Sequence, residues 1–171
     1  MKTVSLFWIG TMLVLAATLQ TSCSSSRTAV NSEQAQAVKQ QIESRRYRIS
    51  VNRMLPMKGP SQYLTSSYSL TVRGDTVISY LPYFGQAYSL PYGGGKGLNF
   101  ESTVTVYSLS FDAKGTARIS FQTRSENETF LYLIEIFVNG SSSIRVTSSN
   151  RQSVSFYGAL EPEEAPPAVM I

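Results

Sequence analysis

Between Tyr47 and Tyr157, most of the chain alternates apolar and polar residues with a period of two. This pattern is typical of β-strands that bury one face. Residues 67–73 show it clearly, and the Gly74-Asp75 pair that follows has glycine first. Such a pair predicts a two-residue type II′ turn, which sets Val72 opposite Val77.

The later turns predict a series of antiparallel hairpins in which apolar residues face one another. Three-residue loops give the expected pairs Leu109 with Ile119, Ile134 with Ile144, and Val146 with Val154. A two-residue Asn139-Gly140 loop would place Ile144 opposite Glu135, so the three-residue loop is preferred because register follows the buried face. The apolar phase flips between Val104 and Tyr107, which predicts a bulge or a corner near Val106.

The segment before the first strand has the pattern of one helix. Asn31 or Ser32 provides an N-cap, and the helix is expected to run to about Arg46. Its apolar stripe is thin and has to pack on another element: Ala35, Val38 and Ile42. The densest basic cluster is interpreted as the helix end, where guanidinium groups favour the last carbonyls: Arg45, Arg46 and Arg48.

These elements predict the fold class. The segment Phe130–Val138 is apolar on both faces apart from Glu135, so its second face is expected to be covered, with the amino-terminal helix as the candidate. Long meanders that bend in this way tend to curl. We expect an α+β domain in which the helix packs on a curved, mostly antiparallel β-meander of about seven or eight strands, half-barrel or barrel-like.

The amino terminus has the pattern of an export signal. Lys2 precedes an apolar stretch over 4–17 and a small-residue segment over 19–22, and Cys23 follows as the single cysteine. The arrangement resembles a bacterial lipoprotein signal, which implies cleavage after residue 22 and attachment of diacylglycerol, with acyl chains such as palmitate, to Cys23. The alternative is an ordinary secretory signal with a chance cysteine.

The rest of the chain divides accordingly. Residues 23–30 are expected to be a lipidated flexible tether, 31–160 a single domain, and 161–171 a disordered tail rich in proline and glutamate. The tether lacks acidic residues, which by resemblance to other lipoproteins implies the periplasmic side. We expect a protein anchored in the outer membrane through Cys23 and facing the periplasm.

Composition removes several classes of chemistry. The chain has no histidine, and its only cysteine is assigned to lipid, so histidine-based catalytic triads, thiolate nucleophiles and His/Cys metal sites are excluded. The formal net charge is only +4, with no basic block, which argues against nucleic acid as a partner. We expect no catalytic residue, no metal, no cofactor and no enzyme activity.

The segment 82–97 is the most unusual part of the chain. It is longer than most connections in compact domains, and such loops are often functional. Four aromatic residues stand among its prolines and glycines and are the candidate ligand-binding residues: Tyr83, Phe84, Tyr88 and Tyr92. Either these rings contact a ligand, or they plug the open end of the β-structure as a lid or second core.

Two carboxylates leave an enzymatic alternative open. Glu135 lies inside an apolar strand, and Glu101 lies near the long loop. A glycosidase would need two carboxylates that face each other, and nothing in the sequence brings this pair together.

Several segments together resemble a known family. They are Ser79 to Gly97 with the following Leu98-Asn99-Phe100, then Asn150-Arg151-Gln152 and Tyr157-Gly158. The family is one of Gram-negative envelope lipoproteins catalogued as a domain of unknown function, and the resemblance covers about residues 35–160. It implies no activity, cofactor or catalytic residue.

The leading functional expectation is a lipid-anchored, non-catalytic envelope protein that binds an envelope protein, glycan or lipid through the loop 82–97. One alternative is a lipid or lipoprotein carrier built around an apolar cavity, which rests on analogy of fold. The other is a hydrolase that uses Glu101 or Glu135.

Overall fold

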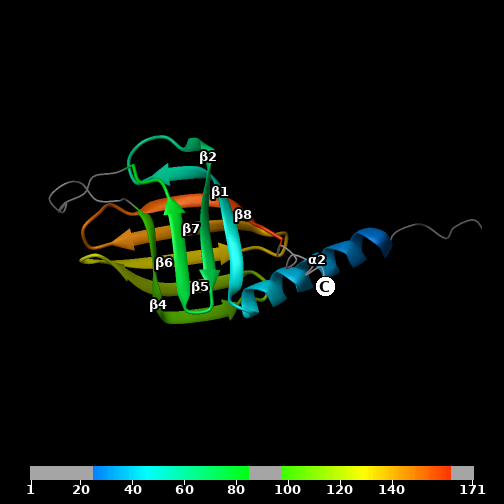
Figure 1. The fold of residues 1–171 in the computed structure, drawn as a ribbon. Coiled ribbons are helices and arrows are strands. Elements are labelled where there is room, and N and C mark those ends of the chain that lie inside the picture. Colours follow the sequence, from blue (N-terminus) through cyan, green and yellow to red (C-terminus); the bar gives the residue numbers. More distant parts are fainter. Residues whose placement is uncertain (1–24, 85–97, 163–171) are drawn as a thin grey trace, which may run out of the picture. The chain divides into compact units, whose positions relative to one another are not determined.

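The structure is a computed structural model that describes residues 25–84 and 98–162, with side chains from residue 33 onward. Its main body, within the unit that begins at Glu33, is a closed barrel of eight antiparallel strands in chain order (Figure 1). The helix and strands are α2 Ser25–Glu43, β1 Arg46–Pro56, β2 Gln62–Arg73, β3 Thr76–Leu81, β4 Leu98–Phe111, β5 Ala117–Ser125, β6 Glu128–Ile136, β7 Ser141–Ser148 and β8 Val154–Leu160.

The predicted combination of a helix with an antiparallel meander is confirmed, and the barrel is closed where a half-barrel was also considered. Closure comes from β8, which pairs with β1 from Ile49↔Leu160 to Pro56↔Val154. In a closed barrel, backbone groups are left unpaired only where a strand extends beyond the end of its neighbour.

The predicted registers are also confirmed. Val72 pairs with Val77 around Gly74, whose φ of 63° suits the first position of a type II′ turn. The three-residue loops give the expected pairs Leu109↔Ile119, Ile134↔Ile144 and Val146↔Val154. Each of these registers keeps the apolar side chains on the inner face.

The expected bulge lies at Val106. The register of β4 against β5 shifts between Thr105 and Ser108, and Val106 has a φ of 52° and is 75% exposed. The extra residue turns Val106 outward and restores the alternation, so that Val104 and Tyr107 both pack against the core.

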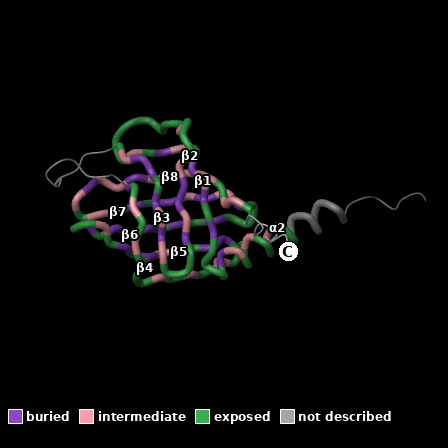
Figure 2. Tube along the Cα trace, in the orientation of Figure 1, coloured by how far each residue is buried: buried purple, intermediate pink, exposed green. Residues whose placement is uncertain are grey.

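The barrel interior is filled by side chains. Figure 2 shows buried positions along every strand, and large rings stack across the centre. The Phe121 and Tyr132 rings lie 4.9 Å apart, and Tyr107 stacks on Phe121 at 6.2 Å. An eight-stranded barrel is just wide enough for such filling.

The strand directions give the barrel two ends. At the loop end lie the connections 57–61, 126–127 and 149–153, together with residues 82–84, which follow β3. At the helix end lie the last turns of α2, the turns at 74–75, 112–116 and 137–140, and the point where the chain leaves β8. The tail expected to be without structure is held at its first residue, because the Glu161 N–H donates to the Arg48 carbonyl over 2.8 Å.

The helix differs from its prediction in extent and position. It begins at Ser25, inside the segment predicted to be a tether, and ends at Glu43. Ile42 is fully buried in the barrel core, whereas Leu133 on the outer face of β6 is 42% exposed. The helix therefore closes the helix end of the barrel, and the expectation that it covers the outer face of Phe130–Val138 is wrong.

Of the basic cluster, only Arg45 lies at the helix end. Arg45 follows the helix with a φ of 54°, a left-handed conformation that ends it, and its N–H donates to the Ile42 carbonyl over 3.0 Å. Arg46 and Arg48 lie in β1 with exposed side chains. The interpretation of Arg46 and Arg48 as partners of the last helix carbonyls is therefore wrong. Within the described ranges, no helix is long and apolar enough to cross a membrane.

Candidate functional site

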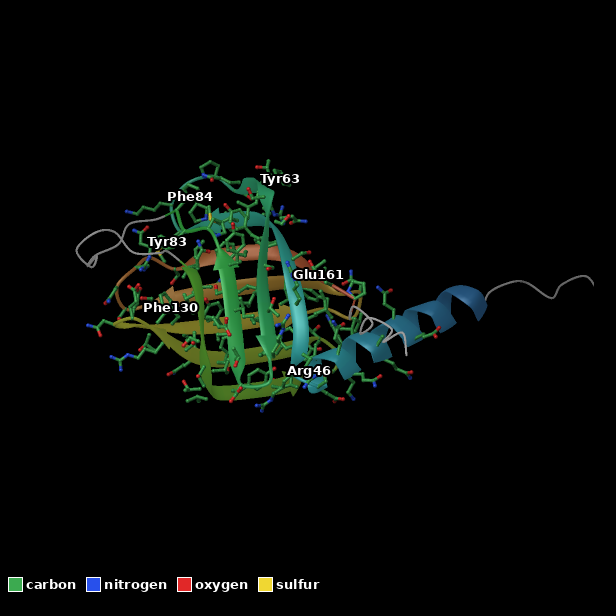
Figure 3. All side chains as sticks on the ribbon, viewed as in Figure 1. Arg46, Tyr63, Tyr83, Phe84, Phe130 and Glu161 are labelled. Carbon is green, nitrogen blue, oxygen red and sulfur yellow. The ribbon has the colours of Figure 1, made fainter. Side chains whose placement is uncertain are left out.

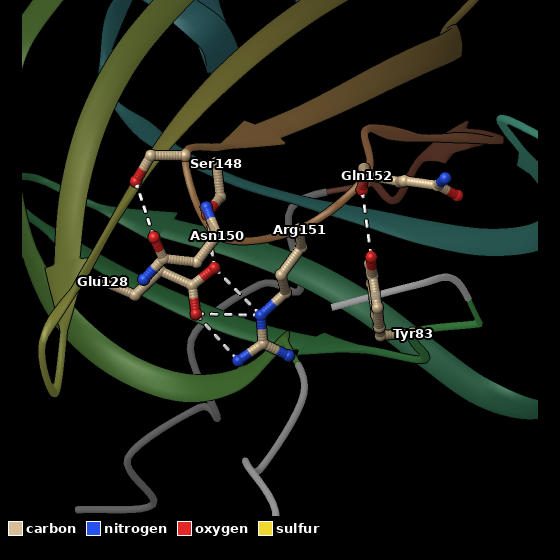
Figure 4. Close-up of polar contacts among 7 residues, drawn as sticks. Tyr83, Glu128, Ser148, Asn150, Arg151 and Gln152 are labelled. Carbon is tan, nitrogen blue, oxygen red and sulfur yellow. Dashed lines mark hydrogen bonds and ion pairs between the residues drawn. The ribbon is translucent and has the colours of Figure 1, made fainter. Parts of the chain in front are cut away.

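A buried ion pair lies at the loop end of the barrel (Figure 4). The Arg151 Nε donates to both carboxylate oxygens of Glu128, over 2.9 and 2.8 Å, and Arg151 Nη2 lies 2.8 Å from Glu128 Oε2. Both side chains are less than 10% exposed. Ser148 Oγ also donates to Glu128, and the Asn150 N–H donates to Ser148 Oγ over 3.0 Å.

Local structure explains why these charges meet. Glu128 is the first residue of β6 and shares the inward face with Phe130 and Tyr132, since residues two apart in a strand point the same way. Arg151 comes from the loop between β7 and β8, which crosses the same end. The ion pair therefore joins the start of β6 to the loop between β7 and β8 at this end of the barrel.

Aromatic rings flank the Arg151 guanidinium. Its central carbon lies 5.3 Å from the centre of the Tyr83 ring and 5.9 Å from that of Phe130. Rings at this distance attract a guanidinium and keep water away from it. Phe130 in turn stacks on Phe100 at 5.1 Å, so the rings and the ion pair form one packed layer.

The first two aromatic residues of the predicted site play different parts. Tyr83 is half-buried, and its hydroxyl donates to the Gln152 carbonyl over 3.2 Å, so it helps to plug the barrel end. Phe84, the next residue, is 56% exposed (Figure 3). Tyr88 and Tyr92 lie outside the described residues, as does Cys23.

Further exposed apolar side chains stand at the same end. Met57 follows β1, and Tyr63 stands near the start of β2; they are 61% and 81% exposed. Figure 3 labels Tyr63 and Phe84 on this part of the barrel. We call Met57, Tyr63 and Phe84 the apolar rim. All three belong to the loop end, and exposed apolar groups of this kind can contribute to a binding surface.

The loop end offers little internal space in its described part. The cavity beside the ion pair has a volume of about 10 Å³. That is room for about one water molecule. A partner that approaches this end would therefore meet the outward rim rather than a deep pocket.

The structure does not bring the two predicted acids together. Glu101 and Glu135 are both exposed, near opposite ends of β4 and β6. Glu135 lies 3.6 Å from Arg118 Nε on the neighbouring strand. Among the residues that the structure describes, no group of three or more metal-ligating side chains occurs.

Sequence reasoning missed Glu128. The available signal was its place in the alternation, because Glu128 falls on the same face as the inward residues of β6, whereas Glu135 falls on the outer face. Arg151 was noted only as part of a segment that resembles a family. Its partner on β6 could not be inferred, because no turn connects the two residues directly.

Comparisons with known proteins agree with the fold. A model of the family described as "Domain of unknown function (DUF4251)" matches residues 29–160. A crystal structure of a DUF4251 family protein from Bacteroides eggerthii DSM 20697, at 1.95 Å resolution, has a TM-score of 0.60 and 15% identity over 78% of this chain and 91% of that chain. No curated protein matches this chain in sequence. Since the family model covers nearly the whole barrel and the helix, the chain belongs to the DUF4251 family of domains of unknown function.

Proposed function

We propose that this protein is a lipid-anchored, non-catalytic binding protein of the cell envelope, with its contact region at the loop end of the barrel. The observation that carries the proposal is the contrast between two neighbours: Tyr83 is tied down on Arg151 and Gln152, while Phe84 points outward. The fixed Tyr83 ring orients the neighbouring Phe84, whose exposed side chain then reaches a partner.

The apolar rim supports binding over catalysis. Phe84, Tyr63 and Met57 present exposed apolar area at the loop end. At the same end, the buried acid Glu128 is held by Arg151 and Ser148, which occupy its carboxylate oxygens. Rigid aromatic side chains of this kind bind proteins, glycans or lipids at low entropic cost.

The anchor and the location rest on the sequence. The proposal places the lipid on Cys23 and the domain at the outer membrane, facing the periplasm. Labelled palmitate incorporated into the wild-type chain and lost in Cys23→Ser would support it. Labelled but soluble protein, or an unlabelled wild-type chain, would contradict it.

A carrier function has weaker support. The interior is occupied by large buried side chains, among them Phe121, Tyr132 and Phe156, rather than by an open apolar cavity along the described strands. The hydrolase alternative lacks its carboxylate pair, because Glu101 and Glu135 are both solvated and lie on different strands near opposite ends.

Site-specific crosslinking in intact envelopes tests the binding proposal. A photoreactive residue at position 84 should capture a discrete partner, because Phe84 is exposed on the rim. The matched control carries the same residue at Leu133, which is exposed on the outer wall of β6. Capture from position 84 alone supports the proposal. Equal capture from both positions, or none from position 84, contradicts it.

A further inference from the structure

A basic groove lies at the helix end of the barrel, away from the apolar rim. Its volume is about 690 Å³, and its charged and polar lining comes from Gln41, Arg46, Arg48, Arg73, Asp75 and Glu161. Figure 3 labels Arg46 and Glu161 beside the end of α2. The groove runs along the first residues of β1, where β8 has already ended.

Two of the arginines that line the groove lie opposite each other. Arg46 and Arg73 are directly opposite in the β1–β2 ladder. Among the described residues, neither makes an ion pair, although Asp75 also lines the groove. Like charges in directly opposed positions repel each other, so this pair favours an anion beside one of the two guanidinium groups.

The third arginine already holds a carboxylate. Arg48 Nε lies 3.0 Å from Glu161 Oε2, and the Glu161 N–H donates to the Arg48 carbonyl over 2.8 Å. From the helix, Gln41 Nε2 donates to the Glu161 carbonyl over 2.8 Å. These three bonds hold the chain against β1 where it leaves β8.

Strand direction and spacing give the position of the next carboxylate. Because β8 is antiparallel to β1, the chain beyond Glu161 heads from Arg48 toward Arg46. Pro162 keeps the residue before it extended. In an extended chain, residues two apart share a face and lie roughly 6.6 Å from each other, the same spacing as Arg48 and Arg46 on β1.

We propose that the basic groove binds an extended acidic peptide and that its occupant is the carboxyl-terminal segment of this chain. Glu161 is the first carboxylate of that segment, and Glu163 is the next one on the same face. Continuing the register of β8 on β1 past Ile49↔Leu160 sets position 163 opposite Arg46, on the side of β1 away from Arg73. In this arrangement the Glu163 carboxylate neutralises Arg46 and so relieves the repulsion within the facing pair. Glu164 is the next residue, and neighbouring residues of an extended segment fall on opposite faces.

Binding of the acidic segment would protect an open part of the barrel. Bound in the groove, the acidic segment covers the part of β1 that β8 leaves open, which protects an unpaired strand edge. The contact is exposed to solvent, so it weakens as salt screens the charges.

Nuclear magnetic resonance of the arginine side chains tests the proposal in the chain that begins at Cys23 with serine in place of cysteine. Glu163→Gln should shift the Nε–H resonance of Arg46, and that of Arg73 by less because Arg73 lies one strand further away. Glu164→Gln is the matched control, because it removes the same charge one residue further on and should shift these resonances much less. Raising the salt concentration should move the wild-type resonances toward those of Glu163→Gln.

A charge swap provides the second measurement. Arg46→Glu should release the segment and shift the amide resonance of Glu161, whose N–H donates to the Arg48 carbonyl. Combining it with Glu163→Arg should return that resonance toward its wild-type position. Equal shifts in Glu163→Gln and Glu164→Gln, or no shift in either, would overturn the proposal. So would inorganic phosphate that binds a chain ending at Pro162 no more tightly than the full chain, because a bound tail must compete with it.

Discussion

Arg151 closes the loop end of the barrel by forming a bidentate ion pair with Glu128, and both side chains are almost fully removed from water. Two buried charges are tolerated only when each satisfies the other. Here the rings of Tyr83 and Phe130 also lie near the guanidinium. The pair thus connects the start of β6 to the loop before β8, against which the Tyr83 ring lies.

The ion pair predicts an asymmetric response to mutation. Glu128→Gln or Arg151→Met leaves one buried charge alone and should lower the free energy of unfolding by about 3–5 kcal/mol. The double variant Glu128→Leu with Arg151→Met should lose less than either single variant, because no charge is left unpaired. Denaturant unfolding measures both.

The exposed pair Arg118–Glu135 is the control for this prediction, since its side chains are 61% and 48% exposed. Arg118→Met should change the free energy of unfolding by less than about 1 kcal/mol. If single variants of the buried pair cost no more than this, the ion pair has no structural role.

Much of the barrel could be predicted because its hairpins are local. Gly74 and Gly140 mark turns whose length decides which apolar residues face one another, and the observed pairs follow. The phase flip at Val106 likewise located the bulge. In each case, the turn and the apolar alternation lie within about 15 residues of one another, so the sequence carries both signals together.

The remaining features depend on contacts between distant residues. Closure requires Ile49 to pair with Leu160, and no turn connects these strands. The helix position also escaped prediction, because a thin apolar stripe fits the end of a barrel as well as its wall. At the site, Glu128 was missed since its partner Arg151 approaches from another loop.

Gly158 allows a test of the closing seam between β8 and β1. A Cβ at this position would overlap the Ser50 carbonyl oxygen and lie 2.9 Å from the Ser50 carbonyl carbon and 3.1 Å from Val51 Cα. These are backbone atoms, so the strands must separate. Gly158→Ala should lower the free energy of unfolding by about 3 kcal/mol or more.

Gly74→Ala is the matched substitution, because nothing lies within 4 Å of the added Cβ. Its φ of 63° costs an alanine about 1–2 kcal/mol. If Gly158→Ala lowers the free energy of unfolding no more than Gly74→Ala does, the close contact between β8 and β1 does not contribute to stability and the prediction is wrong.

Ile42 tests whether the helix is part of the barrel core. Its side chain is fully buried at the helix end. Ile42→Ala should therefore cost about 2–5 kcal/mol, and Ile42→Val about 0.5–1.5 kcal/mol. Denaturant unfolding distinguishes this graded loss from a helix that packs loosely, for which both variants would be close to the wild type.

The buried tyrosines predict loss of stability at alkaline pH. Burial raises the pKa of Tyr132, whose hydroxyl donates to Ser79 Oγ over 3.0 Å, and burial also raises the pKa of Tyr47 and of Tyr107. A raised folded pKa means that stability is fully present below the unfolded pKa of about 10 and falls as pH rises above it. Each such tyrosine contributes up to about 1.4 kcal/mol per pH unit.

Tyr132→Phe removes one of these groups and should make the decline of the unfolding free energy above about pH 10 shallower by up to that amount. The variant should also be less stable at neutral pH, because Ser79 Oγ loses its buried partner. Tyr63→Phe, which changes an 81% exposed hydroxyl, should leave the slope unchanged. Denaturant unfolding at a series of pH values measures all three proteins. The buried Tyr132 ring stacks on Phe121, and its hydroxyl bonds to Ser79. An identical slope in Tyr132→Phe and wild type would show that Tyr132 nevertheless ionises in the barrel as readily as in the unfolded chain, and would contradict the prediction.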